Sequence, residues 1–216
     1  INQKQSILDV IKDQIEVRKD YNLNLEEVKV PATKVMLTVE ELSFGYPEMS
    51  DFLINNFNLK IVGPERIQIS GANGCGKSTL LRLICGDLKP SKGQVTVGAK
   101  RVAYLDQLVR CLDPTLSVVE NFLKLNADSK IFDAYSRLAS FDFRNKDAEK
   151  IISHMSGGEK IRAGISIILS SFHVPDLLIL DEPTNHLDFE MIDAVEKALM
   201  HYQGAILAVS HDDVFL

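Results

Sequence analysis

The sequence lacks tryptophan, is poor in cysteine, and contains no apolar run of about 18 or more residues, the length that a membrane-spanning helix requires. Its three cysteines, Cys75, Cys85 and Cys111, have no C-x-x-C spacing, which argues against a zinc site or a thioredoxin-like redox site. Sparse thiols in an odd number are typical of a reducing compartment, and the first residues show no secretory signal. We therefore expect a cytoplasmic protein without direct membrane insertion.

The sequence also has no excess of positive charge. Its 30 Asp and Glu residues outnumber its 24 Lys and Arg residues and give a net charge of −6. Nucleic-acid binding relies on Lys and Arg at phosphates, so the balance argues against an electrostatic nucleic-acid binder. The 216 residues, 45% of them hydrophobic, fit one large soluble domain or one domain with a tail. Since the chain opens on Ile1 and stops at Leu216 just after a strand-like segment, we expect an excerpt of a longer polypeptide.

The first 34 residues differ in pattern from the rest. Ile7, Leu8, Ile11 and Ile15 lie three to four positions apart among polar residues, which indicates one apolar helical stripe, and Pro31 ends the segment. We interpret residues 1–34 as a linker helix or tail, with a specific partner-binding helix as the alternative.

From Val35 onward, strand patterns alternate with helix patterns, which is typical of an α/β domain. A more polar stretch, Leu116–Ser153, is predicted to be mostly helical and inserted between strands. Strands are predicted at Met36–Glu41, Phe57–Val62, Ile67–Ser70, Val95–Val97, Val102–Leu105, Leu177–Leu180 and Ala205–Val209, and helices at Lys77–Cys85, Ser156–Ser171 and Phe189–Tyr202.

The strongest functional signal is a glycine-rich loop between a predicted strand and a predicted helix. It fits the phosphate-loop pattern G-x-x-x-x-G-K-[ST], in which glycines let backbone N–H groups turn toward one anion. Lys77 is expected to reach the β- and γ-phosphates, and Ser78 to place its hydroxyl on Mg²⁺. The predicted nucleotide contacts are Gly71, Ala72, Asn73, Gly74, Cys75, Gly76, Lys77, Ser78 and Thr79.

A second signal follows the apolar run Leu177–Leu180, where two acids stand at the carboxyl end of a predicted buried strand. Open α/β sheets bind their ligands at that edge. Asp181 is expected to hold Mg²⁺, and Glu182 to act as the general base toward the attacking water. Pro183 disfavours helical geometry for the residue before it, so we expect an extended backbone at Glu182.

A third motif distinguishes among phosphate-loop enzymes. Ser156 and Glu159 have the spacing of a capping box at a helix start, and Gly157 and Gly158 between them expose backbone N–H groups. Read alone, the pattern only begins a helix. With Met155 before it, however, it resembles the LSGGE signature of ATP-binding cassette (ABC) proteins, and the resemblance extends over nearly all of Val35–Leu216.

The resemblance implies an α/β phosphate-loop NTPase fold for residues 35–216, with a mixed β-sheet core, an antiparallel β subdomain, a helical subdomain inserted at about 109–155 and a truncated C-terminus. It also implies that Ser156, Gly157, Gly158 and Glu159 face the nucleotide of a second cassette. Further roles carried over are adenine stacking for Tyr46, with Phe44 as the fallback, magnesium and water sensing for Gln107, dimer communication for Asp188 and γ-phosphate contact for His211. Tyr46 could instead be a core aromatic, and Asp188 only a helix N-cap.

Residues 183–188, with the sequence Pro-Thr-Asn-His-Leu-Asp, are similar to the ABC-F branch, whose members carry two cassettes, lack transmembrane domains and in many cases act on ribosomes. This implies that the chain is a second cassette with the end of the interdomain linker. It implies Mg²⁺-dependent ATP hydrolysis with ATP, a second cassette and the ribosome as partners. Asp213 stands where the branch usually has Arg. The alternative is the nucleotide-binding subunit of an ABC membrane transporter.

Overall fold

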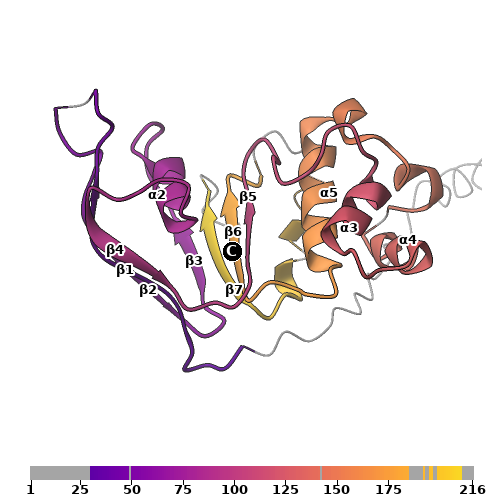
Figure 1. The fold of residues 1–216 in the computed structure, drawn as a ribbon, viewed down its shortest axis with the longest axis horizontal. Coiled ribbons are helices and arrows are strands. Elements are labelled where there is room, and N and C mark those ends of the chain that lie inside the picture. The colour runs from indigo at the N-terminus through magenta and orange to yellow at the C-terminus, as the bar shows by residue number, and fades with distance from the viewer. Residues whose placement is uncertain are drawn as a thin grey trace, which may run out of the picture.

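The computed structural model describes residues 30–48, 50–141, 143–184, 192, 195–196 and 199–210. The amphipathic segment predicted near the start of the chain lies outside these residues. Two sheets organise the described part: a three-stranded antiparallel sheet and a four-stranded parallel sheet. Helices flank the parallel sheet on both sides, as Figure 1 shows.

The antiparallel sheet has the order β2-β1-β4, formed by β1 (Val35–Phe44), β2 (Ile54–Val62) and β4 (Lys92–Val97). Its central strand, β1, has inward-facing apolar side chains such as Leu37 and Val39, which are almost fully buried. The pairing of β1 with β4 shifts register between Glu40 and Ser43, so this part of the sheet contains a bulge or irregularity.

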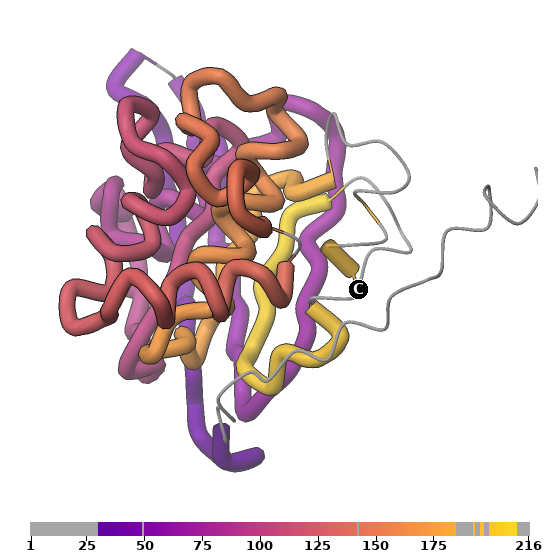
Figure 2. Tube along the Cα trace, turned by 90° about the vertical axis from the view of Figure 1, so that its right-hand side faces the viewer, coloured from indigo at the N-terminus to yellow at the C-terminus, as the bar shows by residue number. Residues whose placement is uncertain are grey.

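The parallel sheet has the order β3-β7-β6-β5, formed by β3 (Arg66–Ile69), β5 (Val102–Leu105), β6 (Leu177–Asp181) and β7 (Ala205–Val209). In Figure 2, β7 in yellow runs between β3 in purple and β6 in orange. Every residue of the two central strands is buried, as expected for parallel strands covered on both faces. The carboxyl ends of all four strands therefore meet at one edge.

One face of the parallel sheet packs against α2 (Lys77–Ile84) and the antiparallel sheet. Leu177 and Ile179 of β6 point to this side, where they join Leu80 and Leu81 of α2 in one buried cluster. Figure 1 shows α2 between the two sheets. The first turn of α2 is thereby held beside the carboxyl end of β6.

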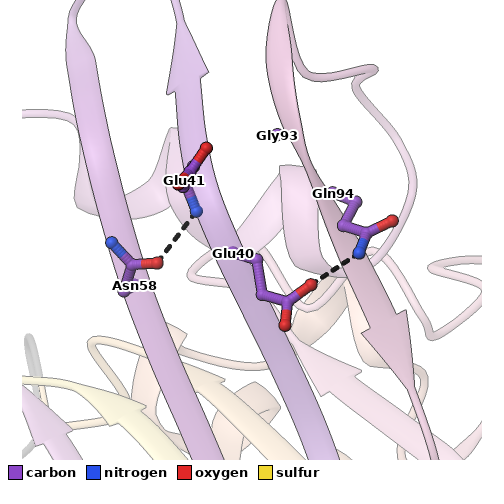
Figure 3. Close-up of a pocket in the computed structure, with 5 residues that line it drawn as sticks. All are labelled: Glu40, Glu41, Asn58, Gly93 and Gln94. Carbon is purple, nitrogen blue, oxygen red and sulfur yellow. Dashed lines mark hydrogen bonds between the residues drawn. The ribbon is translucent and has the colours of Figure 1, made fainter.

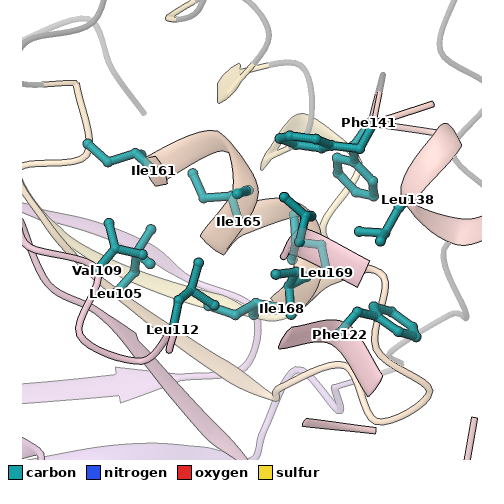
Figure 4. Close-up of a cluster of buried hydrophobic side chains, with 14 of the residues drawn as sticks. Leu105, Val109, Leu112, Phe122, Leu138, Phe141, Ile161, Ile165, Ile168 and Leu169 are labelled. Atoms are coloured by element: carbon teal, nitrogen blue, oxygen red, sulfur yellow. The ribbon is translucent and has the colours of Figure 1, made fainter. Parts of the chain in front are cut away.

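The other face packs against the helices α3 (Val118–Leu125), α4 (Ile131–Ala139) and α5 (Gly157–Leu169). Figure 4 shows the apolar side chains that α5, α3 and the chain after β5 contribute to this cluster. Gly164 brings α5 close to β5, because a Cβ added there would lie 2.6 Å from Cδ1 of Leu105. Packing of α5 on the sheet fixes where its N-terminus points.

The α/β class and the presence of both parallel and antiparallel strands are confirmed, with the two kinds in separate sheets. In the described part of residues 116–154 there are two α-helices and two short 3₁₀ turns, Asn145–Asp147 and Ile152–His154, so this stretch contains more loop than predicted. The predicted helix Phe189–Tyr202 lies partly outside the described residues; those described at 192, 195–196 and 199–200 are helical.

Candidate nucleotide site

The glycine-rich loop joins β3 to α2 at the carboxyl edge of the parallel sheet, as predicted. Gly74 and Gly76 have φ values of 79° and 101°, a region that favours glycine. Lys77 is the first residue of α2 and is only 7% exposed, and its Nζ donates to the carbonyl oxygens of Gly71 and Ala72 at 2.8 and 3.0 Å. The ammonium group thus lies against the loop, and residues 71–75 of this loop are exposed to solvent.

A carboxylate from the sheet contacts a hydroxyl from the helix beside this loop. Ser78 Oγ donates to Oδ1 of Asp181 at 3.2 Å, and Asp181 is 4% exposed. Hydroxyl and carboxylate oxygens are ligands that Mg²⁺ prefers, and the ion usually takes one or two carboxylates together with phosphate oxygens. The two side chains therefore fit a magnesium site next to a phosphate cradle.

Burial is the main reason why the pKa of Asp181 is raised above its ordinary value. The neighbouring Glu182 carboxylate raises it further, while hydrogen bonds from Ser78 and Tyr104 oppose the shift. The ionised carboxylate is therefore held at a cost in free energy, which a bound cation would lower.

Glu182 directly follows β6, and its backbone differs from the prediction. The expected extended conformation is wrong, because φ at this residue is 51°, in the left-handed region. Its N–H donates to the carbonyl oxygen of Val209 at 2.8 Å, which continues the pairing with β7 by one residue. The following proline does disfavour right-handed helical geometry, but the chain leaves the strand through a positive φ rather than by extension.

Tyr46 lies beside the start of α2 and packs, half-buried, against the core cluster on that side of the sheet. Its hydroxyl and Oγ1 of Thr79 are 3.2 Å apart and share a hydrogen bond, and its ring stands edge-to-face on Phe44 at 5.0 Å between centroids. Tyr46 is half-buried, whereas Phe44 is 7% exposed. Of the two aromatic candidates, Tyr46 is the more accessible one beside the phosphate loop.

The capping box predicted at the start of α5 is present. Ser156 Oγ accepts from the N–H of Glu159 at 3.3 Å, and a Glu159 carboxylate oxygen accepts from the N–H of Ser156 at 2.7 Å. Lys150 also pairs with Glu159, and these hydrogen bonds lower the pKa of Glu159 to about 2. Ser156 and Gly157 remain exposed, so this helix start faces solvent.

A family model described as ABC transporter matches residues 54–185, more than half of the chain. The chain belongs to the ABC transporter family. It is 36% identical over 92% of its length to ABC transporter F family member 2 of Arabidopsis thaliana, and 35% identical over 85% of its length to the ATP-binding protein Uup of Escherichia coli. The match spans 29% of each relative, so the chain corresponds to about a third or less of the length of these proteins.

Among solved structures, the ATP-binding cassette MJ0796, in a dimer bound to ADP and Pi, has a TM-score of 0.71 to this ABC domain at 21% identity, covering 83% of this chain and 90% of that one. This likeness shows the ABC ATPase fold. No helix among the described residues is both long and apolar enough to cross a membrane.

The structure brings Lys77, Ser78 and Asp181 together. Gln107 lies exposed in the turn directly after β5, at the same edge of the sheet as Asp181. Asp188 and His211 lie outside the described residues, so their assigned roles stay predictions.

Sequence reasoning missed Tyr104, whose hydroxyl donates to Oδ2 of Asp181 at 3.4 Å. The alternation along β5 puts this residue on one face, but only the register against β6 reveals what its side chain meets. The capping box of α3, Ser117 with Glu120, was also missed although it carries the same spacing as the one singled out at Ser156.

A separate polar pocket of about 490 Å³ lies on the antiparallel sheet (Figure 3). Its polar groups are engaged with one another: Gln94 Nε2 donates to Oε2 of Glu40, and Asn58 Oδ1 accepts from the N–H of Glu41 at 2.9 Å. Gly93 also lines the pocket, and a Cβ added there would clash with the carbonyl oxygen of Glu40 in β1. The pocket lies where the pairing of β1 with β4 shifts register, and it does not belong to the nucleotide site.

Proposed function

We propose that this chain binds Mg-ATP on the loop Gly71–Thr79 and hydrolyses it when a second cassette closes over the nucleotide. The observation that carries the proposal is the contact between Ser78 and the buried Asp181 beside an exposed glycine-rich loop. Family membership makes ATP hydrolysis the expected chemistry.

In this proposal Lys77 exchanges partners when the nucleotide arrives. Its ammonium group donates to two loop carbonyls, Gly71 and Ala72, and would turn to the β- and γ-phosphates. Ser78 and Asp181 would hold Mg²⁺, and the ion would neutralise negative charge on the phosphate oxygens. Tyr46, beside Thr79, would stack on adenine.

Glu182 would accept the proton of the water that attacks the γ-phosphorus, with ADP as the leaving group. Its position directly after Asp181 places the proposed base beside the proposed metal ligand. Gln107 would orient the metal and the water from the end of β5, and His211 would contact the γ-phosphate. Asp188 would communicate between the two cassettes.

The need for a second cassette is supported by the helix start at Ser156. Two helices begin with the same capping box, yet Ser117 is 5% exposed and bridged to Ile151, whereas Ser156 and Gly157 are exposed. The helix start exposes Ser156 and Gly157, while Gly158 is buried, and backbone N–H groups at such a helix start are donors to an anion. We propose that these donors complete the γ-phosphate site of a neighbouring cassette.

For the whole protein we propose a cytoplasmic ATPase of the ABC-F type that acts on ribosomes, with residues 1–34 as linker, 35–216 as the second cassette and about 109–155 as its helical subdomain. The F family relative supports this assignment. A transporter subunit would share the same catalytic residues. Co-sedimentation of the full-length protein with ribosomes in Mg-ATP is expected for the first role, and co-purification with a membrane partner for the second.

The catalytic proposal is tested with Glu182→Gln. We expect this variant to bind Mg-ATP as wild type does, to lose turnover, and to accumulate as an ATP-bound dimer, because the base is removed while the binding groups remain. Light scattering after size exclusion measures the mass with and without Mg-ATP, and phosphate release measures turnover. Equal turnover in wild type and variant would remove Glu182 from this role.

A further inference from the structure

Both carboxylate oxygens of Asp181 are engaged by hydroxyl groups that come from different elements. Ser78 of α2 donates to Oδ1 at 3.2 Å, and Tyr104 of β5 donates to Oδ2 at 3.4 Å. A tyrosine hydroxyl has an ordinary pKa near 10 and keeps its proton at neutral pH, so it acts as the donor toward the carboxylate.

The register of the sheet explains why Tyr104 reaches this carboxylate. Tyr104 pairs with Ile179 in the parallel ladder, so Asp181 lies two residues further along the neighbouring strand and on the same face. That face packs against α2, which contributes Ser78. The long phenol side chain spans the diagonal between the strands.

We propose that Tyr104 is a positioning residue for magnesium, which holds Oδ2 of Asp181 so that Oδ1 stays directed toward Ser78 and the metal. The inference rests on the proposed Mg-ATP site and adds a residue to it.

The physical argument is one of orientation. The terminal torsion of an aspartate side chain has a broad energy profile, so a single hydrogen bond leaves the carboxylate plane free to rotate. Asp181 is 4% exposed and has little water to hold it. A second, charge-assisted bond from the adjacent strand restricts the plane before the metal binds.

Other groups around Asp181 are less suited to this task. Asp106, at the end of β5, carries a negative charge and pairs with Arg110 at 3.0 Å. Cys85, the C-cap residue of α2, stays a thiol, because burial raises its pKa to about 12. Glu182 is itself negative and repels the carboxylate. Among the described residues, Tyr104 provides the side-chain hydrogen bond to Oδ2.

The test is Tyr104→Phe, which removes the hydroxyl and keeps the ring. ATP affinity is measured by calorimetry in excess Mg²⁺ and in EDTA. The dissociation constant in EDTA divided by the dissociation constant in Mg²⁺ is the gain in affinity due to the metal. Loss of a group that orients a metal ligand typically costs about 10- to 100-fold in metal affinity. Because the bond here is long, we expect the ratio to fall about tenfold, with affinity in EDTA unchanged.

The matched control is Tyr135→Phe, which deletes the same atom on α4, where the hydroxyl donates to Oε1 of Glu149 at 3.1 Å. It should leave both affinities unchanged. Unaltered ATP binding in EDTA also reports that the loop of Tyr104→Phe is folded.

Two results would overturn the inference while the proposed function stands: a wild-type ratio in Tyr104→Phe, or an equal loss of affinity in Mg²⁺ and in EDTA, which would indicate a structural role. If the wild-type protein bound no ATP under either condition, the proposed function would fail and this inference with it.

Discussion

Gly76, the last residue before α2, is the position where a single methyl group should be most damaging to the phosphate loop. Its φ of 101° lies where L-residues are strained. A Cβ built there would be 3.1 and 3.3 Å from Cγ and Cδ2 of Leu53. Gly76→Ala therefore combines backbone strain with a steric contact.

The two penalties can be separated with Gly74→Ala, because Gly74 has a similar φ of 79° but nothing within 4 Å of an added Cβ. Holding a residue in such a backbone region costs about 1–3 kcal/mol, and that cost should apply to both variants. The contact with Leu53 should add about 1 kcal/mol at Gly76, since overpacking typically costs 1–3 and this side chain can partly move.

We expect Gly76→Ala to unfold about 1 kcal/mol more easily than Gly74→Ala, as measured by urea denaturation with tryptophan-free detection such as circular dichroism. A shift of this size corresponds to about 2–4 °C in Tm for a chain of this length. Gly76→Ala should also lose ATP affinity, because the loop must distort to relieve the contact.

A double-mutant cycle with Leu53→Ala tests the steric part. Once Leu53 is shortened, Gly76→Ala should cost no more than Gly74→Ala does. If the two glycine variants are equally stable in the presence of Leu53, or if shortening Leu53 brings no relief, the reasoning from the contact distances is wrong.

Two further predictions concern a helix cap and a partly buried ion pair. Ser156→Ala should lower stability by about 1 kcal/mol through the lost cap and abolish the ATP-dependent dimer, whereas Ser117→Ala should lower stability and leave dimerisation intact; light scattering measures the difference. For Asp176, burial raises the pKa, but Lys34, the Lys100 N–H and Arg101 together lower it below its ordinary value. A lowered pKa means that the ionised carboxylate stabilises the fold above about pH 4. Asp176→Asn should therefore lower the free energy of unfolding by about 2 kcal/mol at pH 7. In denaturation experiments this difference from wild type should shrink as pH falls below about 4.

The parts of the fold that the sequence predicted best are those where one local pattern has one structural meaning. The runs at Leu177–Leu180 and Ala205–Val209 contain only apolar residues and became strands with every residue buried. The glycine-rich loop required a strand before it and a helix after it, and Lys77 begins that helix. Ser156 and Glu159 marked the start of α5 to the residue.

What the sequence could not supply depends on contacts between distant segments. The bond from Tyr104 to Asp181 follows from the pairing of β5 with β6, whose strands are separated by α3, α4 and α5 in the chain. Glu182 donates its N–H to Val209 and then turns through a positive φ, a combination that no local rule for the residue before proline predicts. The inserted helix α4 is short and has no side-chain cap at its start, so no local pattern marks where it begins.

Two unfavourable features of this fold lie side by side at the carboxyl edge of β6. Asp181 is buried with its pKa raised, and Glu182 adds a second negative charge from a backbone in the left-handed region. Strained residues and raised carboxyl pKa values cost stability in the free protein, and they persist only where the surrounding structure holds them. A ligand that binds the folded state and brings a divalent cation to Asp181 would offset the charge there, and so would stabilise the fold by its own binding free energy. If the proposed Mg-ATP site is right, the stability of the cassette should therefore rise with occupancy by metal and nucleotide.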